Sequence, residues 1–208
     1  MQDKLTLRKI PKQKRSIERY HRIMEVTFDL LGEVGYEALN TDLIAARSGI
    51  PIGSIYQFFP NKESIVYTHA EFCFINLHDQ FFHKIATELE KFKKFNQKFL
   101  EKTLSIYIET LANVRGYHLI ESVLYTNPKL RDLDRESNER FAKSLADRVI
   151  LRFFPKLEKK RAFYIASIIV EIVDSTYKVI ANTRNPKVRA GLLSELKNLL
   201  FQYFLSFS

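Results

Sequence analysis

The sequence contains few of the residues that cross-link or interrupt a fold. Of its 208 residues only one is a cysteine, Cys73, so no internal disulfide can form, which fits a reducing compartment. Six glycines and six prolines are few for this length and predict long helices with few breaks. No apolar run reaches the roughly 20 residues of a membrane span, and residues 1–20 lack the apolar core of a signal peptide. We therefore expect a cytoplasmic protein that makes no membrane contact.

Positive charge is concentrated at the start of the chain. The sequence has 33 basic and 24 acidic residues, a net charge of +9. Residues 1–22 contain eight basic and two acidic residues, so they carry six of those nine charges. Because Lys and Arg displace counterions from phosphates, we interpret residues 1–14 as a flexible basic arm that contacts a polyanion, together with Lys14 and Arg15. A solvated tail without a partner is the alternative interpretation.

Apolar residues recur at helical spacing from Ser16 to the end of the chain, and no segment alternates as a strand does. The pattern predicts an all-α fold. A domain of three short helices is expected over residues 15–62, and a larger helical domain over residues 63–208. The predicted helices cover residues 16–35, 41–48, 51–59, 62–91, 96–114, 118–125, 130–154, 159–182 and 186–204.

Two of the short helices form a pair with a tight turn between them. Asn40 or Thr41 is a good N-cap for the first helix, and Gly49 ends it. Pro51 is favourable in the first turn of the second helix, because its missing N–H costs nothing there. This is the arrangement of a helix-turn-helix, whose second helix enters the major groove of DNA.

The residues of this pair suit contacts with DNA. Gly53 and Ser54 are small and allow the backbone to approach closely. Ile52 can contact a thymine methyl group, and Ser54 and Gln57 can hydrogen-bond to base edges. Asn40, Thr41, Tyr56 and Lys62 are neutral donors or cations that suit phosphates. From spacing alone, a three-helix packing unit without DNA remains the alternative.

The stretch Asn40-Thr41-Asp42-Leu43-Ile44-Ala45-Ala46-Arg47-Ser48-Gly49-Ile50-Pro51-Ile52-Gly53-Ser54-Ile55-Tyr56-Gln57-Phe58-Phe59-Pro60-Asn61-Lys62-Glu63 resembles the helix-turn-helix signature of TetR-type regulators. Upstream, the apolar pattern from Ile23 to Gly35 resembles the first helix of that signature, so the resemblance covers about residues 15–66. It implies an all-helical homodimer, a palindromic double-stranded operator, and repression relieved by a small-molecule effector. Residues 15–62 would then be the DNA-binding domain, and residues 63–208 the ligand-binding and dimerisation domain. The resemblance also implies phosphate contacts at Asn40, Thr41, Tyr56 and Lys62, and base contacts at Ile52, Gly53, Ser54 and Gln57.

Two residues depart from the pattern of that family. Pro51 stands where Ser or Thr is usual, and Ile52 stands where a basic or polar residue is frequent. Both changes remove groups that could contact DNA near the start of the second helix. We therefore expect the basic arm to matter more than usual in this chain.

The remainder of the chain is rich in aromatic residues at helical spacing, which are mostly core residues. As a set they leave room for an apolar pocket between helices. A mostly apolar small molecule is the expected effector, with Tyr107, Tyr125 and His118 as candidate polar anchors. The candidate lining residues are Leu77, Phe81, Tyr107, Leu111, Tyr125, Phe141, Leu145 and Ile169.

The last two predicted helices are apolar over more than one face, although one core requires a stripe of only about 100°. The surplus indicates a second buried contact, such as a four-helix interface between two copies of the chain. A deeply buried helix inside a monomer is the alternative. The candidate interface residues are Ile168, Ile172, Leu193, Leu196, Leu200 and Phe204.

No motif in the sequence indicates catalysis, a cofactor or a metal. Among five histidines only His83 has a possible partner ligand at helical spacing, Asp79, and no third ligand is evident. GxSxG, Walker, GxGxxG and HExxH motifs are absent. The main alternative function is a helical interaction module whose basic arm binds an acidic partner or an anionic membrane surface.

Deletion of residues 1–14 should flatten the dependence of DNA affinity on salt. The slope of log K against log salt concentration is negative, and each lost phosphate contact makes it less steep by about 0.9. The measurement is binding to one duplex at several salt concentrations, with the full chain as reference. An unchanged slope would show that the arm makes no phosphate contact.

Overall fold

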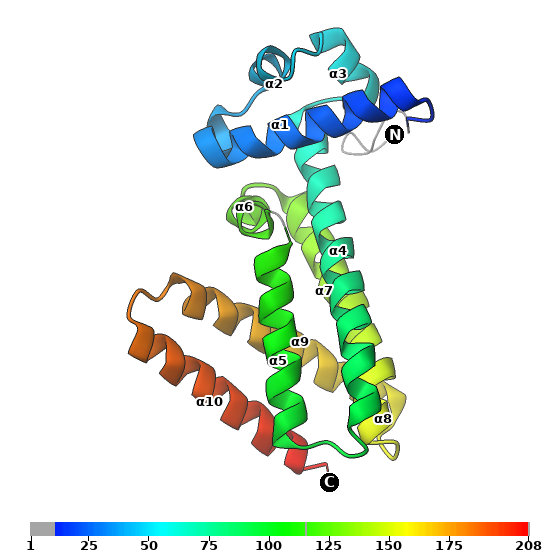
Figure 1. Ribbon diagram of the computed structural model, residues 1–208, viewed down its shortest axis with the longest axis vertical. Helices are drawn as coiled ribbons and strands as arrows, with labels where there is room; N and C mark the ends of the chain where they lie inside the picture. Colours follow the sequence, from blue (N-terminus) through cyan, green and yellow to red (C-terminus); the bar gives the residue numbers. More distant parts are fainter. Residues whose placement is uncertain (1–10, 115, 208) are drawn as a thin grey trace. The chain divides into compact units, whose positions relative to one another are not determined.

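The chain is all-helical in the computed structural model, which describes residues 11–114 and 116–207 apart from the side chain of Tyr125. These residues contain no strand, so the predicted all-α fold is confirmed. The long elements, shown in Figure 1, are α1 (Lys14–Ala38), α2 (Thr41–Ser48), α3 (Ile52–Phe58), α4 (Lys62–Lys91), α5 (Gln97–Asn113), α6 (Tyr117–Val123), α7 (Pro128–Leu145), α9 (Lys159–Asn182) and α10 (Pro186–Leu205). The short ones are the 3₁₀ turn η1 (Leu124–Thr126), the π-helical turn η2 (Ala146–Ile150) and α8 (Leu151–Phe153).

The described residues form two compact units. The N-terminal unit contains the residues up to Asn76 together with Val114–Leu133, and the C-terminal unit contains Leu77–Asn113 and the residues from Asp134 onward. Helices α4 and α7 each begin in the N-terminal unit and end in the C-terminal unit. The predicted boundary between functional domains at residue 62 differs from this division into compact units and stays a prediction. Residues 1–10 of the predicted arm lie outside the described residues.

Helix α1 contributes one apolar face to the N-terminal core. Its apolar residues recur every three or four positions, and Ile23, Leu30 and Leu31 are buried. Gly35 has φ 76° and ψ 172°, so regular helical geometry ends there, one turn before Ala38. The sequence predicts this end because glycine enters the positive-φ region without a steric penalty.

A close contact in the N-terminal unit joins α1 to the start of α6. The ring of Phe28 stacks on that of His69, with the ring centroids 4.1 Å apart. The same ring lies against Gly116, which has φ 83° and precedes α6 as its N-cap residue. A Cβ at residue 116 would lie 1.6 Å from Cζ of Phe28, so only glycine fits at this position.

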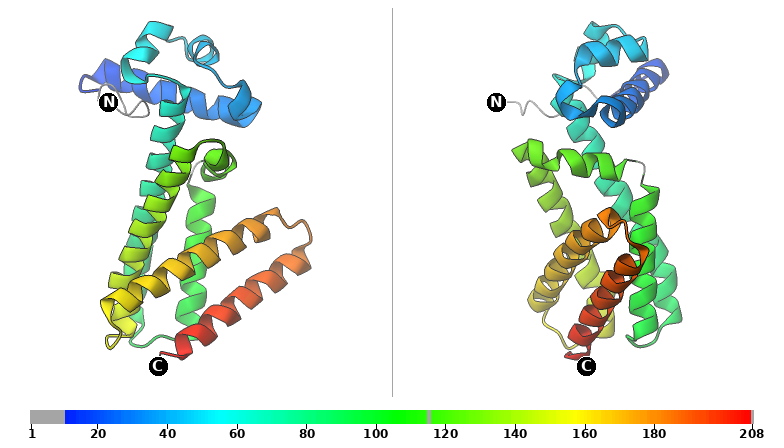
Figure 2. Two further views of the ribbon diagram at one scale, coloured as in Figure 1. Left: turned by 180° about the vertical axis from the view of Figure 1, so that it is seen from behind. Right: turned by 90° about the vertical axis from the view of Figure 1, so that its left-hand side faces the viewer.

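Helices α9 and α10 of the C-terminal unit are antiparallel neighbours, visible in both views of Figure 2. Asn185 caps α10, because its side-chain oxygen accepts hydrogen bonds from the backbone N–H of Lys187 (2.9 Å) and Val188 (3.4 Å). Pro186 occupies the first turn of α10, where no N–H is needed. One side of this pair packs into the core through Ile169, Leu200 and other buried residues.

The sequence predicts one continuous helix over residues 130–154, and this prediction is wrong in detail. The segment is divided into α7, the π-helical turn η2 and α8. The π-helical turn accommodates an extra residue, and Leu145, Val149 and Ile150 are buried around it. Propensity does not reveal such a turn, because it depends on the packing of neighbouring helices. Single π-helical turns inside α-helices are frequent at functional sites.

No helix in residues 11–114 and 116–207 combines the length and apolar character that a membrane span requires. Within the same residues, no cluster of three His, Cys, Asp or Glu side chains is arranged to hold a metal ion.

Replacement of Gly116 by Ala should lower the free energy of unfolding by about 2–4 kcal/mol. The methyl group would overlap the buried ring of Phe28 and would also be forced into a positive φ. Urea denaturation followed by circular dichroism measures the change. Gly191→Ala is the matched control, because nothing lies within 4 Å of its added Cβ and alanine is favourable in a helix. Equal stability of the Gly116→Ala and native proteins would contradict the close contact.

Candidate nucleic-acid interface and apolar pockets

The turn between α2 and α3 is fixed by backbone geometry and one side chain. Gly49 has φ 70° and ψ 13°, and its N–H donates to the carbonyl of Ala45 at 3.0 Å. The hydroxyl of Ser48 accepts a hydrogen bond from the N–H of Ile50 at 3.2 Å. Glycine enables the left-handed conformation that reverses the chain between the two helices. The predicted helix-turn-helix pair is therefore present, with a tight turn.

Helix α3 presents one face to solvent and buries the other. Ile55 and Phe58 are 0% and 4% exposed and hold the helix against the core. The opposite face is formed by residues that the sequence assigns to DNA: Pro51, Ile52, Gly53, Tyr56 and Gln57 are exposed, and Ser54 is half-buried. This face is small and mostly uncharged, so it allows close approach to base edges.

Pro51 precedes α3 as its N-cap rather than occupying its first helical position. Its backbone is extended, with φ −53° and ψ 137°, and no side-chain hydrogen bond caps the helix. The carbonyl of Pro51 accepts from the N–H of Ser54 at 2.8 Å, which starts the helix. The N-terminus of α3 therefore has no side-chain cap, as expected from proline in place of Ser or Thr.

The N-terminus of α2 is held by the side chains that the sequence assigns to phosphates. The side-chain oxygen of Asn40 accepts from the N–H of Leu43 at 2.9 Å, and its amide donates to the carbonyl of Ala38 at 3.3 Å. The hydroxyl groups of Thr41 and Tyr56 are hydrogen-bonded to each other at 3.1 Å. These bonds orient α2 and α3 together, so the side chains of Asn40, Thr41 and Tyr56 form a fixed surface at the edge of the helix pair.

Lys62 has a structural role that sequence reasoning missed. Its ammonium group donates to the carbonyl of Tyr36 at 2.9 Å and to that of Glu37 at 3.4 Å, and lies 4.7 Å from the centre of the Tyr36 ring. Burial raises the pKa of the Tyr36 hydroxyl, and the charge of Glu63 raises it further. Lys62 therefore satisfies carbonyl groups at the C-terminus of α1, and its predicted phosphate contact stays a prediction.

An ion pair between α1 and α2 was also not predicted from the sequence. The guanidinium of Arg47 donates to both carboxylate oxygens of Glu33, at 3.0 and 2.8 Å. This hydrogen bonding holds the pKa of the Glu33 carboxyl below its ordinary value. The two residues are 14 positions apart, so only the packing of α2 on α1 brings them together. Bidentate pairs of this kind fix relative orientation.

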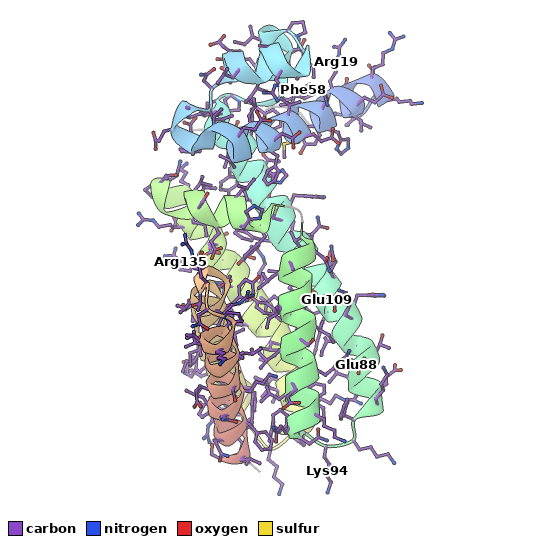
Figure 3. All side chains as sticks on the ribbon, turned by 60° about the vertical axis from the view of Figure 1, so that its left-hand side comes forward. Arg19, Phe58, Glu88, Lys94, Glu109 and Arg135 are labelled. Carbon is purple, nitrogen blue, oxygen red and sulfur yellow. The ribbon has the colours of Figure 1, made fainter. Side chains whose placement is uncertain are left out.

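Basic residues continue from the predicted arm onto α1. Lys14 and Arg15 lie in the first turn of α1 and are exposed, and Arg19 and Arg22 are exposed further along the helix. Arg15, Arg19 and Arg22 are three or four positions apart, so they lie on one side of the helix. Figure 3 shows Arg19 extending into solvent from α1. The basic surface thus extends beyond residues 1–14.

Two apolar pockets lie inside the C-terminal unit. The first, here called the inner pocket, has a volume of about 50 Å³ and is lined by Phe81, Thr103, Leu104, Tyr107, Phe141, Leu145, Ile169, Val170 and Val173. The second, here called the end pocket, has a volume of about 60 Å³ and is lined by Phe95, Phe99, Leu100, Thr103, Leu104, Leu145, Val149, Ile150, Phe153, Phe154, Ile169, Leu200 and Phe204. The pockets share Thr103, Leu104, Leu145 and Ile169, so they are neighbours.

The predicted effector residues divide between these pockets and other places. Leu77 and Leu111 are buried but line neither pocket, and His118 is exposed on α6. The side chain of Tyr125 lies outside the described residues. The remaining predicted residues all line the inner pocket, and they are Phe81, Tyr107, Phe141, Leu145 and Ile169.

The aromatic residues of the end pocket were not identified from the sequence. Phe95, Phe153 and Phe204 come from three segments that are far apart in the chain, and their rings form one cluster. Phe95 lies in the connection between α4 and α5, outside the predicted helices over residues 62–91 and 96–114. Phenylalanines among the lysines of residues 91–95 were the sequence signal that could have indicated a buried aromatic cluster there.

Burial corrects the predicted dimer residues. Leu196, Leu200 and Phe204 are buried within the chain itself, and Leu200 and Phe204 line the end pocket, so none of them is available at a surface. Ile168 is 52% exposed, while Ile172 and Leu193 are half-buried. The large apolar residues that α9 and α10 expose are Tyr164, Ile168, Val179, Val188, Leu199, Tyr203 and Leu205.

Cys73 is a core residue. It is buried in α4, and burial raises the pKa of its thiol to about 12. A thiol that stays protonated at neutral pH is a poor nucleophile and metal ligand.

Comparison with known proteins confirms the resemblance seen in the sequence. Residues 23–67 match the family described as "Bacterial regulatory proteins, tetR family". The HTH-type transcriptional repressor KstR of Rhodococcus jostii (strain RHA1) is 38% identical over 45 residues, which are 22% of this chain and 21% of that protein. The matched segment thus spans about a fifth of the length of this curated relative. The family match over residues 23–67 contains α2, α3 and the turn between them.

Solved structures share the fold over nearly the whole chain. A TetR-family transcriptional regulator from Streptomyces coelicolor has a TM-score of 0.60 at 22% identity, with 91% of this chain and 99% of that one covered. The fatty acid degradation regulator FadR from Bacillus halodurans has a TM-score of 0.64 at 16% identity, with 92% and 97% covered. At these identities the likeness establishes the fold alone.

Replacement of Lys62 by Ala should lower the free energy of unfolding by about 1–2 kcal/mol, because the carbonyl groups of Tyr36 and Glu37 lose a charged donor. Thermal or urea denaturation measures this effect. Lys12→Ala is the control, since Lys12 is exposed before α1 and its loss should change stability by less than about 0.5 kcal/mol. Equal stability of the Lys62→Ala and Lys12→Ala proteins would exclude the structural role.

Proposed function

We propose that this chain, whose residues 23–67 match the TetR family of bacterial regulatory proteins, is a homodimeric transcriptional regulator. It binds a palindromic operator through α3 and is released by a small, mostly apolar effector. The observation that carries the proposal is the exposed face of α3, which directly follows a glycine turn inside the matched segment. The name of the matched relative, a transcriptional repressor, supports repression as the mode of action.

In this proposal the two kinds of DNA contact come from different parts of the N-terminal unit. Ile52, Ser54 and Gln57 meet base edges in the major groove, with Gly53 allowing the backbone to approach. Phosphates are contacted by Lys14 and Arg15, and by the fixed surface that Asn40, Thr41 and Tyr56 form. Base contacts determine sequence preference, and phosphate contacts determine most of the salt-dependent affinity.

The proposed effector site is in the C-terminal unit. Because typical small-molecule sites measure about 300–1,000 Å³, an effector must move the surrounding helices apart to enter the inner and end pockets, which have volumes of about 50 and 60 Å³. Their walls are apolar, which supports a mostly apolar effector. Helices α4 and α7 continue from this unit into the N-terminal unit, so a change in their position on effector binding can alter DNA affinity. A binding role of this kind requires no catalytic residues.

The experiment that tests the proposed function is selection of bound sequences from random duplex DNA with the purified full chain. An enriched inverted repeat, bound roughly 10³-fold or more tightly than random duplex, is the expected result. No enrichment with folded, dimeric protein would reject operator binding. It would favour the helical interaction module, whose binding to acidic partners depends on salt and ignores sequence.

We expect the proposed dimer to be formed by the exposed apolar residues of α9 and α10. Ile168→Asp and Leu199→Asp should each convert the dimer to a 24.5 kDa monomer, because each places a charge in an apolar interface. Sedimentation velocity at micromolar concentration measures the change. Ile75→Asp is the matched control, since Ile75 is 48% exposed on α4 and lies outside the proposed interface. A native protein that already sediments as a monomer would refute the dimer.

A further inference from the structure

The end pocket lies beside two chain segments that are rich in lysine. The connection between α4 and α5 contributes Phe95, whose ring centroid is 4.7 Å from that of Phe204 and 5.5 Å from that of Phe154. Lys93 and Lys94 immediately precede Phe95, and Lys98 follows in the first turn of α5. All three lysines are exposed, and Figure 3 shows Lys94 extending into solvent.

A second lysine-rich segment follows the other aromatic residues of the end pocket. Phe153 and Phe154 line the pocket where α8 ends. The connection to α9 then contains Lys156, and α9 begins with Lys159 and Lys160 after the single acidic residue Glu158. Lys91, at the end of α4, is already paired with Glu88 at 2.9 Å. Positive charge therefore gathers on the same segments that carry the rings of Phe95, Phe153 and Phe154.

The interior of the end pocket has almost no group that could orient a polar ligand. Thr103 has the only polar side chain among its lining residues, and its hydroxyl donates to the carbonyl of Phe99 at 2.8 Å. Because Thr103, Leu104, Leu145 and Ile169 also line the inner pocket, a second apolar pocket adjoins the end pocket along the same side chains. This combination favours an elongated hydrocarbon over a compact ligand that needs hydrogen bonds inside the pocket.

The wall of the end pocket also includes the π-helical turn η2. Leu145 precedes this turn, and Val149 and Ile150 belong to it. All three line the pocket, so the irregular backbone lies at the site itself. Since π-helical turns are frequent at functional sites, the position of η2 is a second, independent indication that the end pocket binds a ligand.

We propose that the end pocket binds the hydrocarbon tail of an amphipathic anion, whose head group is held by Lys93, Lys94 and Lys98. This inference rests on the proposed effector-controlled function and names the chemical class of the effector. A carboxylate or phosphate head group gains attraction from clustered ammonium groups at the surface, while the tail removes apolar surface from water. A neutral amphiphile has the same tail but gains nothing from the lysines.

The test is titration calorimetry of the full chain, without DNA, against four probes, each supplied from the same cyclodextrin carrier so that the apolar probes stay dissolved and monomeric. The probes are hexadecanoic acid, hexadecanoyl-coenzyme A, 1-hexadecanol and coenzyme A without an acyl chain. We expect at least one acylated anion to bind about tenfold or more tightly than 1-hexadecanol, with an affinity that falls as salt increases. Binding of the free acid identifies a carboxylate head group, and binding of the thioester alone identifies a phosphate-bearing one.

Two sets of variants separate the head-group site from the tail site. The triple variant K93A/K94A/K98A should weaken the anionic probe about tenfold and leave 1-hexadecanol unchanged. The control R140A/K143A/R184A removes three exposed basic residues elsewhere in the C-terminal unit and should change neither. T103F and V149F each fill the pocket and should weaken binding of every probe with a hydrocarbon tail: hexadecanoic acid, hexadecanoyl-coenzyme A and 1-hexadecanol. A melting curve of each variant, superimposable on that of the native chain, shows that it is folded.

Equal affinity for the anionic probes and 1-hexadecanol would overturn the head-group site, and so would an unchanged affinity of the triple lysine variant. Coenzyme A that binds as tightly as its acyl thioester would indicate a polyanion surface and overturn the tail site. Failure of all four probes would overturn the proposal as a whole. Since these titrations contain no DNA, their result is independent of operator selection, and failure of one proposal is distinguishable from failure of the other.

Discussion

The arrangement of the DNA-binding surface depends on the burial of one side of two very short helices. Helices α2 and α3 have eight and seven residues, which is too short for a stable isolated helix. Ile44 and Ile55 are fully buried, and Phe58 nearly so, and their contacts with the core hold the pair in place. With that side buried, the turn at Gly49 directs the opposite face of α3 to solvent. The exposed side chains of α3 are not needed for packing, so they are free to contact DNA.

The long elements and the helix-turn-helix could be predicted because their signals are local. Gly49 ends α2 and Asn40 caps it, and each residue acts on backbone groups a few positions away. The exposed face of α3 also follows from helical spacing once Ile55 is placed in the core. The resemblance over residues 23–67 therefore rests on residues whose physical roles are visible in the chain itself.

The rest could not be predicted because it depends on contacts between distant segments. The ammonium group of Lys62 reaches carbonyl groups 25 and 26 positions earlier, and no local pattern distinguishes that contact from one with phosphate. Helices α9 and α10 are apolar on several sides, so spacing alone did not separate Phe204, which packs into the end pocket, from Leu199, which is exposed. The π-helical turn η2 likewise depends on its neighbours. Both pockets are made by such distant contacts.

The central claim is that α3 reads base identity, and Gln57 tests it most directly. Gln57 is exposed on α3, and its amide can pair with adenine in the major groove. The measurement is selection from random duplex DNA carried out in parallel with the native chain and with Gln57→Ala. The account predicts that base preference is lost at one position in each half of the repeat and retained at the others. Unchanged preference at every position would contradict recognition through this face of α3.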